Sequence, residues 1–319
     1  MAQPPIPISA DPIAIVGNIN VDVRTSTIPA SPQLFADGET SVPEIYETAG
    51  GGGANTAIAA ALLGGRVHFC GRVGRDAAGA ALHRHLERIG ITPHLVEAES
   101  ATGRSIALTW DNHCRHFVSS LPSCAALCEK DVDVEALARA NCRHLYRADI
   151  WFAPKMLHGG NLALLRRARA VGMETSIDIN WDPQWNSGDN SAAAERIAAV
   201  MDLLGHVSWA HGNERELCKF AGTADAQTAA ELLLDRSAGG VVIHRGARGS
   251  AAFTREGEQI EAAARPVARV VNEIGTGDVF TAAFLLMPHL SLRERLQWCN
   301  EIAARHMEGT LDLVPRLAD

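Results

Sequence analysis

Strand-like and helix-like patterns alternate along almost the whole of this chain. Residues 67–73 form a short apolar run typical of a buried strand, and residues 77–89 follow with Leu82, Leu86 and Ile89 at helical spacing. The alternation continues through 144–151, 162–170, 174–179, 192–204, 207–210, 214–220, 228–236 and 240–244. Strands joined through helices run parallel, so the sequence predicts an α/β fold with a doubly wound, mostly parallel sheet between helices.

The first expected strand leads into a group of polar residues. The apolar run 13–17 ends in a glycine, and Asn18, Asn20 and Asp22 follow it. Open α/β sheets bind their ligands at the carboxyl ends of the strands. The sequence therefore places these three polar residues near a ligand site at the end of the first strand.

Two segments interrupt the parallel pattern. Residues 105–110 and 115–118 are strand-like and are separated by Asp111-Asn112, which predicts a hairpin. Residues 251–264 predict a second antiparallel pair of strands. The chain is then expected to close with two helices, at 277–287 and 292–308.

Composition narrows the class of protein. A chain of 319 residues that is 47% hydrophobic and 21% charged can bury the core of one large domain. A net charge of −8 without a local block of Lys or Arg argues against a nucleic-acid partner. No stretch has the roughly 18 apolar residues of a membrane span, and the N-terminus lacks the pattern of a signal peptide. We therefore expect a cytoplasmic protein without a membrane partner.

The cysteines and histidines do not predict a disulfide framework or a metal site. Seven cysteines occur at irregular spacing, which is typical of free thiols in a reducing compartment. The pattern nearest to a metal site combines His113, Cys114, His116, Cys124 and Cys128. Zinc ligands usually come in tighter, repeated pairs. Scattered His and Cys is therefore the preferred interpretation.

A glycine-bracketed turn, Gly275-Thr276-Gly277-Asp278, opens an apolar helix near the C-terminus. The free backbone N–H groups and the positive end of the helix dipole meet at such a turn, which predicts an anion site. A Walker A loop is excluded, because none of the lysines follows a glycine. Asp278 either stabilises the start of the helix or acts as a general base, and the turn alone leaves both interpretations open.

The rest of the chain gives this turn its context. Gly50-Gly51-Gly52-Gly53-Ala54-Asn55 and the turn 275–278 together resemble the two signatures of the ribokinase-like, or PfkB, carbohydrate kinase family. The resemblance continues in the family's order through Gly17 with Asp22, 71–76 with Gly79, 178–180, 213–216, and Gly246 with Gly249. It implies a three-layer α/β/α sandwich with a small β lid. It further implies one kinase domain at 12–319, a lid inserted at 23–46 and 100–120, and a flexible segment at 1–11.

The resemblance assigns roles to the turn and to the glycine run. Asp278 is similar to the catalytic base, and Gly275, Thr276 and Gly277 are similar to the anion hole for the transferring phosphoryl group. This agrees with phosphoryl transfer, which needs mainly positioning and neutralisation of charge. Substrate binding is implied for Asp22, Gly51, Gly52, Gly53, Asn55 and Asp149. A carboxylate and a carboxamide beside bare backbone suit a polyol, while the alternative for Asn55 is a residue that starts a helix.

The resemblance also implies the cofactors ATP and Mg²⁺. Asn213 and Glu216 match the family's Asn-x-x-Glu, which helps to hold Mg²⁺ and its waters, and the alternative is a solvated helix cap. Nucleotide binding is implied for Asn213, His244, Gly246, Gly249 and Asn300. A direct phosphate contact of Arg245 is a further hypothesis, with a solvent-exposed side chain as its alternative.

The chain departs from the family pattern at several positions. Asn272-Glu273 stands where relatives often have Asp-Thr beside a monovalent-cation site, which leaves dependence on K⁺ open. Asp182 stands where relatives commonly have Arg. The lid chooses among ribose, fructose, a keto-deoxy acid, a phosphosugar and a nucleoside, and the sequence does not decide between them. Candidates for stacking a nucleoside base, or for the core of the lid, are Phe35, Tyr46, Trp110 and Phe117.

The preferred interpretation is an ATP-dependent kinase that phosphorylates a hydroxymethyl group of a sugar. A nucleoside kinase of the same family and a non-catalytic, ligand-binding relative are the alternatives. A nicotinamide oxidoreductase is excluded, since the glycine run lacks the dinucleotide fingerprint. Small-molecule substrates are the expected partners, together with a second copy of the chain paired through the lid.

Overall fold

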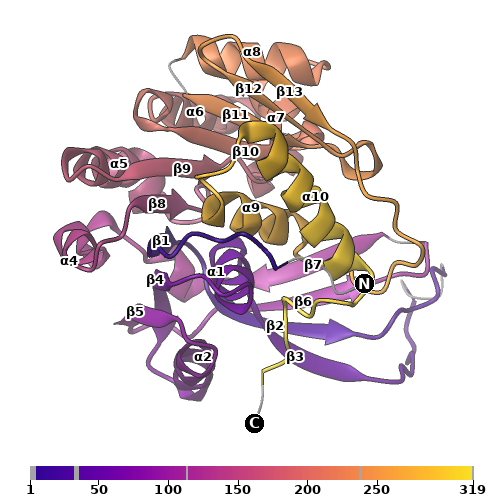
Figure 1. The fold of residues 1–319 in the computed structure, drawn as a ribbon. Helices are drawn as coiled ribbons and strands as arrows, with labels where there is room; N and C mark the ends of the chain where they lie inside the picture. The colour runs from indigo at the N-terminus through magenta and orange to yellow at the C-terminus, as the bar shows by residue number, and fades with distance from the viewer. Residues whose placement is uncertain (1–4, 32–35, 113, 237–238, 318–319) are drawn as a thin grey trace.

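The computed structural model describes residues 5–31, 36–112, 114–236 and 239–317 (Figure 1). Within these ranges the main sheet contains nine strands. Their order across the sheet is β13 (Gln259–Ala262), β12 (Ser250–Thr254), β11 (Gly240–His244), β10 (Trp209–Asn213), β9 (Glu174–Asp178), β8 (His144–Arg147), β1 (Ile13–Val16), β4 (Val67–Gly74) and β5 (Thr92–Ala98). All neighbours from β5 to β11 pair in parallel, whereas β11, β12 and β13 pair antiparallel. The predicted mostly parallel sheet is confirmed.

Helices cover both faces of this sheet (Figure 1). One face packs against α1 (Gly52–Leu62), α2 (Ala77–Arg88), α9 (Thr276–Leu286) and α10 (Leu292–Met307). The other packs against α4 (Val134–Arg139), α5 (Asn161–Ala170), α6 (Asn190–Met201), α7 (Glu214–Ala221) and α8 (Ala226–Asp235). The four residues of β1 are all buried, as expected for a central strand covered on both faces. Among the described residues, no helix is long and apolar enough to cross a membrane.

A second, smaller sheet lies beside the main one (Figure 1). Its strand order is β3 (Ile45–Gly50), β2 (Asn20–Thr25), β6 (Arg104–Thr109) and β7 (Arg115–Ser120), and a short helix α3 (Pro122–Ala125) follows it. We call this sheet the lid. The predicted hairpin of β6 and β7 is confirmed, and so is the antiparallel pair of β12 and β13. The chain's last described residues run along the lid, where Leu317 N donates to Glu47 O.

Several predicted boundaries were wrong. Asn20 and Asp22 do not lie at the end of the first strand, because β1 ends at Val16 and both residues belong to β2 of the lid. The strand expected at 144–151 ends at Arg147. The chain leaves the sheet there because Asp149 adopts a left-handed backbone with φ of 54°, which is incompatible with a continuing strand. Strands β2, β3 and β5 were not predicted.

The N-terminal segment adds to the core beneath α1. Ile6 and Ile8 pack against the same hydrophobic cluster as α1 and α9, and Ser9 N donates to Leu286 O at 2.7 Å. Residues 1–4 lie outside the described ranges. The mobility of the segment 1–11 and the exact domain and lid limits remain predictions.

Candidate active site

Two helix N-termini meet at the edge between the main sheet and the lid. Helix α1 follows the glycine run, and α9 follows the turn that contains Gly275. Asn55 in α1 donates from Nδ2 to Oδ2 of Asp278, the third residue of α9, at 3.0 Å. The structure therefore brings together two predicted site residues that are far apart in the sequence.

Asp278 is held in a setting that disfavours its charged form. Its side chain keeps some contact with solvent, yet surrounding protein encloses it closely enough that burial raises its pKa to about 8. The hydrogen bond from Asn55 acts in the opposite direction, whereas the charges of Asp149, Glu216 and Asp22 add to the increase. A carboxyl group with a pKa near neutrality suits a general base that must also lose its proton after reaction.

The turn before Asp278 is fixed by local contacts. Gly275 has a left-handed φ of 75°, which disfavours residues with a side chain. Thr276 Oγ1 donates to Glu273 O at 2.9 Å, and Asn272 Oδ1 accepts from Ile274 N at 3.1 Å. The N–H groups of the first turn of a helix have no partner within the helix. The turn can therefore bind an anion beside the Asp278 carboxylate.

Each glycine of the run 50–53 allows a close approach. A Cβ atom on Gly53 would lie 2.6 Å from Gly17 Cα, and one on Gly51 would lie 2.5 Å from Asn18 O. A Cβ on Gly50 would overlap the carboxylate of Asp22. The run lets β1, the lid and α1 meet within contact distance, which brings the substrate residues predicted from it into one place.

Asp149 holds the start of α1 against the end of β1. Its Oδ2 accepts from Asn18 N and Gly53 N, both at 2.8 Å, and its Oδ1 accepts from Gly52 N at 3.1 Å. Burial raises the pKa of Asp149, and these backbone hydrogen bonds oppose the increase. The sequence interpretation assigned Asp149 to the substrate. In the structure both of its carboxylate oxygens already have backbone partners, and these contacts position the glycine run.

Asp178 belongs to the same acidic group, although the sequence analysis did not assign it a role. It ends β9, accepts a hydrogen bond from the buried Tyr146 hydroxyl at 3.1 Å, and has a pKa raised well above its usual range by burial and by Glu216. Burial also raises the pKa of Glu216. Buried carboxylates that repel one another are relieved by a cation.

Asn213 and Glu216 form a reciprocal cap at the start of α7. Asn213 Oδ1 accepts from Glu216 N at 3.0 Å, and Glu216 Oε2 accepts from Asn213 N at 2.9 Å. The helix-cap interpretation is thus present in the structure. It is compatible with a metal role, because Glu216 Oε1 is not used by the cap. Among the described residues, no group of three or more His, Cys, Asp or Glu side chains is arranged to hold a metal ion by itself.

Two of the residues expected to bind the nucleotide, His244 and Asn300, lie on the side of the sheet that carries α9 and α10. His244, at the end of β11, packs its ring 4.4 Å from that of Phe280, and its Nδ1 lies 3.5 Å from the position of a Cβ on Gly277. Burial lowers the pKa of His244 to about 4, so its imidazole is neutral at pH 7. Asn300 Nδ2 donates to Ala262 O and Ala263 O at 3.0 and 3.1 Å.

Gly249 also lies against the segment at Ala262 and Ala263 that Asn300 contacts. Its φ is 87°, and a Cβ atom there would lie 2.1 Å from Ala262 O. Gly246 also has a positive φ, 55°, and begins the short turn that leads to Gly249. The two glycines therefore shape the β11–β12 turn, while Asn300 fixes the chain after β13.

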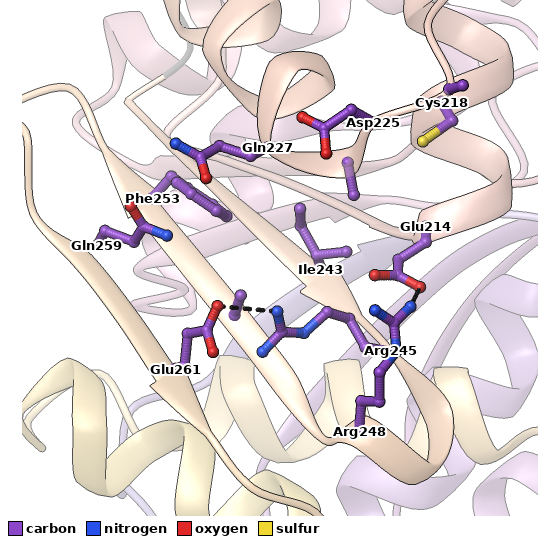
Figure 2. A pocket seen from close by; sticks show the side chains of 13 residues that line it. Glu214, Cys218, Asp225, Gln227, Ile243, Arg245, Arg248, Phe253, Gln259 and Glu261 are labelled. Atoms are coloured by element: carbon purple, nitrogen blue, oxygen red, sulfur yellow. Dashed lines mark hydrogen bonds and ion pairs between the residues drawn. The ribbon is translucent and has the colours of Figure 1, made fainter.

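The Arg245 side chain does not point toward the turn 275–278, where a direct contact with phosphate was hypothesised. Arg245 follows His244, so its side chain lies on the opposite face of the sheet from α9, where it pairs with Glu261 at 2.9 Å (Figure 2). There it lines a cavity of about 290 Å³ between β11–β13 and helices α7 and α8. Arg248 reaches the carboxylate of Glu214 at the rim of the same cavity. Arg245 and Arg248 therefore both have carboxylate partners that lie away from the turn 275–278.

The remaining departures from the family pattern have structural explanations. Asp182 is fully buried and accepts from Nε and Nη2 of Arg196 at 2.7 and 3.0 Å, so it secures α6. The Asn272 side chain closes the turn before Gly275. Of the aromatic candidates in the lid, Phe35 lies outside the described ranges. The guanidinium carbon of Arg316 lies 4.3 Å from the centre of the Tyr46 ring. His113 also lies outside them.

Comparison with known proteins identifies the family. The family model described as "pfkB family carbohydrate kinase" matches residues 11–305. The chain belongs to this family of carbohydrate kinases. The match covers both the lid and the turn 275–278, so the resemblance seen in the sequence is confirmed.

Individual relatives of this pfkB kinase act on different sugars. The chain is 27% identical to a ribokinase of Arabidopsis thaliana over 289 residues, which is 86% of this chain and 70% of that relative. It is 28% identical to a 5-dehydro-2-deoxygluconokinase of Geobacillus kaustophilus over 254 residues, 74% of this chain and 71% of that relative. A ribokinase-like protein of E. coli, solved in complex with ATP and Mg²⁺, has the same fold, with a TM-score of 0.79, 20% identity, and coverage of 97% of both chains.

Proposed function

We propose that this pfkB kinase transfers the γ-phosphoryl group of ATP to a hydroxymethyl group of a sugar, with Asp278 as the general base. The observation that carries the proposal is the position of Asp278. It lies at the N-terminal end of α9, directly after the glycine-bracketed turn, and is hydrogen-bonded to Asn55 at 3.0 Å. A base, an anion-binding turn and a polar acceptor surface are thus within one site.

Asp278 would take the proton of the attacking hydroxyl as the new oxygen–phosphorus bond forms and the bond to the ADP oxygen breaks. The backbone N–H groups of the turn would stabilise the charge on the equatorial oxygens of the transferring group. The hydrogen bond from Asn55 would hold the Asp278 carboxylate in position for the acceptor. Asp22 would bind other hydroxyl groups of the sugar, because its carboxylate faces Gly50, the last residue of β3, which leads into α1.

The residues around Glu216 suit a magnesium ion. Mg²⁺ prefers oxygen ligands, keeps several waters, and needs only one or two carboxylates in addition to phosphates. Glu216 and Asp178 supply carboxylates whose pKa values are raised by burial and, for Asp178, by the charge of Glu216. When bound, the ion would neutralise phosphate charge. Its expected holders are Glu216 and Asp178, with Asn213 keeping Glu216 in place.

Release of ADP tests the kinase proposal. Purified protein with ATP and MgCl₂ is given a panel of sugars, sugar acids, phosphosugars and nucleosides. We expect acceptor-dependent ADP release with a carbohydrate and none with a nucleoside. Tight binding of ATP without acceptor-dependent release across the panel would instead support the non-catalytic interpretation.

A homodimer paired through the lid and a cytoplasmic location remain predictions. The outer face of the lid supports the homodimer, because the side chains of Ile45, Ile106 and Val118 are 64%, 47% and 56% exposed. Contiguous exposed apolar residues often mark an interface. Light scattering after gel filtration should give twice the 34.0 kDa mass of the chain. Ile106→Glu should shift the protein toward the monomer.

A further inference from the structure

Arg24 is an enclosed cation on the same face of the lid as Asp22. The two residues are two positions apart on β2, so their side chains point to the same side of the sheet. Arg24 is 3% exposed, and its Nη2 lies 3.5 Å from Asp22 Oδ2. The negative charge of Asp22 in turn helps to raise the pKa of Asp278. The face that carries Arg24 is therefore the face that serves the acceptor.

The hydrogen bonds of Arg24 are incomplete. Within the ranges that the structure describes, neither Nε nor Nη2 of Arg24 hydrogen-bonds to any acceptor. Asp22 fills this role only in part, since its Oδ1 accepts from Asn20 Nδ2 at 2.7 Å and its Oδ2 lies 3.5 Å from Arg24 Nη2, a contact that opposes the increase in the pKa of Asp22 caused by burial. A buried charged donor without an acceptor is unfavourable. A ligand that brings an acceptor would relieve this cost.

Two other arginines of this protein show which group binds to the Nε and Nη2 atoms of a guanidinium group. Arg72 donates from Nε and Nη2 to the two oxygens of Asp131, both at 2.7 Å. Arg196 donates from the same two nitrogens to Asp182 at 2.7 and 3.0 Å. In both cases the edge formed by Nε and Nη2 binds one carboxylate with two hydrogen bonds. On Arg24 neither nitrogen of this edge hydrogen-bonds to a carboxylate of the described residues, and Nη2 makes only the 3.5 Å ion pair with Asp22.

Strand pairing places Arg24 at the far end of the acceptor surface. Asp22 lies opposite Thr48 on β3 and Ser105 on β6, whereas Arg24 lies opposite Tyr46 and Ala107 in the next row. Asn20 and Gly50 form the row on the other side, which leads into α1. Two residues advance a strand by about 6.6 Å. The backbone of Arg24 is thus displaced from that of Asp22 in the direction away from α1 and Asp278, while its Nη2 reaches back to 3.5 Å from Asp22 Oδ2.

From this arrangement we infer that the acceptor is a sugar acid, whose carboxylate binds the Nε–Nη2 edge of Arg24 while a hydroxyl group at its other end faces Asp278. The inference rests on the proposed kinase function and specifies its substrate class. A planar carboxylate matches this edge with two parallel hydrogen bonds. The buried Thr48 Oγ1, which also lacks a hydrogen-bond partner among the described residues, offers a donor to the same ligand.

The test compares acceptors that differ at one group. An aldonic or keto-deoxy acid, the neutral sugar of the same carbon number, and the corresponding phosphosugar are assayed for ADP release with ATP and MgCl₂. We expect kcat/KM for the acid to exceed that for the neutral sugar by about 10²-fold or more, because a site built for a polar group rejects analogues that leave it unpaired. Most of the difference should lie in KM, since the contact is far from the reacting atoms.

Variants of Arg24 assign this preference to its guanidinium group. Arg24→Met should reduce the ratio of acid to neutral kcat/KM by about 10²-fold, and Arg24→Lys should restore part of it by charge without the two-point contact. Arg104→Met is the matched control. It removes one positive charge from the neighbouring lid strand, where Arg104 is exposed and pairs with Glu47 at 3.2 Å, and the ratio should stay unchanged.

Three results would overturn the inference about Arg24 while the kinase function stands. They are equal kcat/KM for the neutral sugar and the acid, a preference for the phosphosugar, and an unchanged ratio in folded Arg24→Met or Arg24→Lys. If no acceptor releases ADP, the kinase function fails instead. Calorimetry with the acid then tests Arg24 separately, because binding that is lost in Arg24→Met supports the carboxylate site and equal binding contradicts it.

Discussion

The turn around Asp278 and the inner face of the lid differ in which groups the protein supports with hydrogen bonds. At the glycine run, Asp149 accepts three backbone N–H groups and Asn55 Nδ2 donates to Asp278, so both carboxylates have partners, although the buried Asn18 Oδ1 and Asn55 Oδ1 have none among the described residues. On the lid, Arg24 and Thr48 keep buried polar atoms without hydrogen-bond partners among the described residues. The contrast suggests a division of roles. The reacting groups are preorganised by the protein, whereas the acceptor surface is completed by the ligand.

The largest expected effect is at Asp278. Asp278→Asn keeps the shape and the contact with Asn55 but removes the base, so kcat should fall by roughly 10² to 10⁴-fold. Steady-state ADP release over a range of acceptor concentrations measures this, and ATP binding by calorimetry is the control for folding. Unchanged turnover in a folded Asp278→Asn variant would falsify the assigned role.

The next effect tests the rigid side of the comparison. Gly53→Ala should destabilise the protein by about 1–3 kcal/mol, because its Cβ would meet Gly17 Cα at 2.6 Å and backbone atoms yield little. Urea unfolding measures the change in the free energy of unfolding. The matched control is Gly205→Ala, where a Cβ would have no neighbour within 4 Å and the change should stay within about 0.5 kcal/mol. Equal effects of the two variants would contradict the close approach at Gly53.

The pH dependence should show a smaller, graded effect. With a pKa of about 8, Asp278 is mostly protonated at pH 6 and becomes an active base as the pH rises. The kcat/KM for the acceptor should therefore increase about tenfold per pH unit below the pKa and level off above it. A profile that is flat from pH 6 to pH 9 would argue against Asp278 as the titrating group.

The sequence was sufficient for the fold and for the turn. Parallel strands and their helices were predicted because their apolar residues recur at strand or helix spacing, as in β4 and α2. Gly275 and Asp278 were found because a positive-φ glycine and an acidic first turn are typical of a helix start that binds an anion. Agreement with the family order then connected this turn to Asn55, and the structure places the two residues in contact.

The lid could not be predicted in the same way. Strand β2 reads Asn-Val-Asp-Val-Arg-Thr, and its buried face includes Asn20, Asp22 and Arg24. An alternating pattern normally places apolar residues inside, so this strand was missed and Arg24 gave no sign of being buried. The position of Asp149 was equally hidden, since its three partners are Asn18, which follows β1, and Gly52 and Gly53 of α1. The surroundings of Arg24 and Asp149 are both made by segments that are distant in the sequence.

One measurement tests the division of roles most directly. Asp278→Asn and Arg24→Met are compared with the unchanged protein in one ADP-release assay that yields kcat and KM for a sugar acid. We predict that Asp278→Asn lowers kcat with little change in KM, and that Arg24→Met raises KM with most of kcat retained. If both variants alter the same parameter in the same way, the separation between a catalytic turn and a lid that selects the acceptor is contradicted.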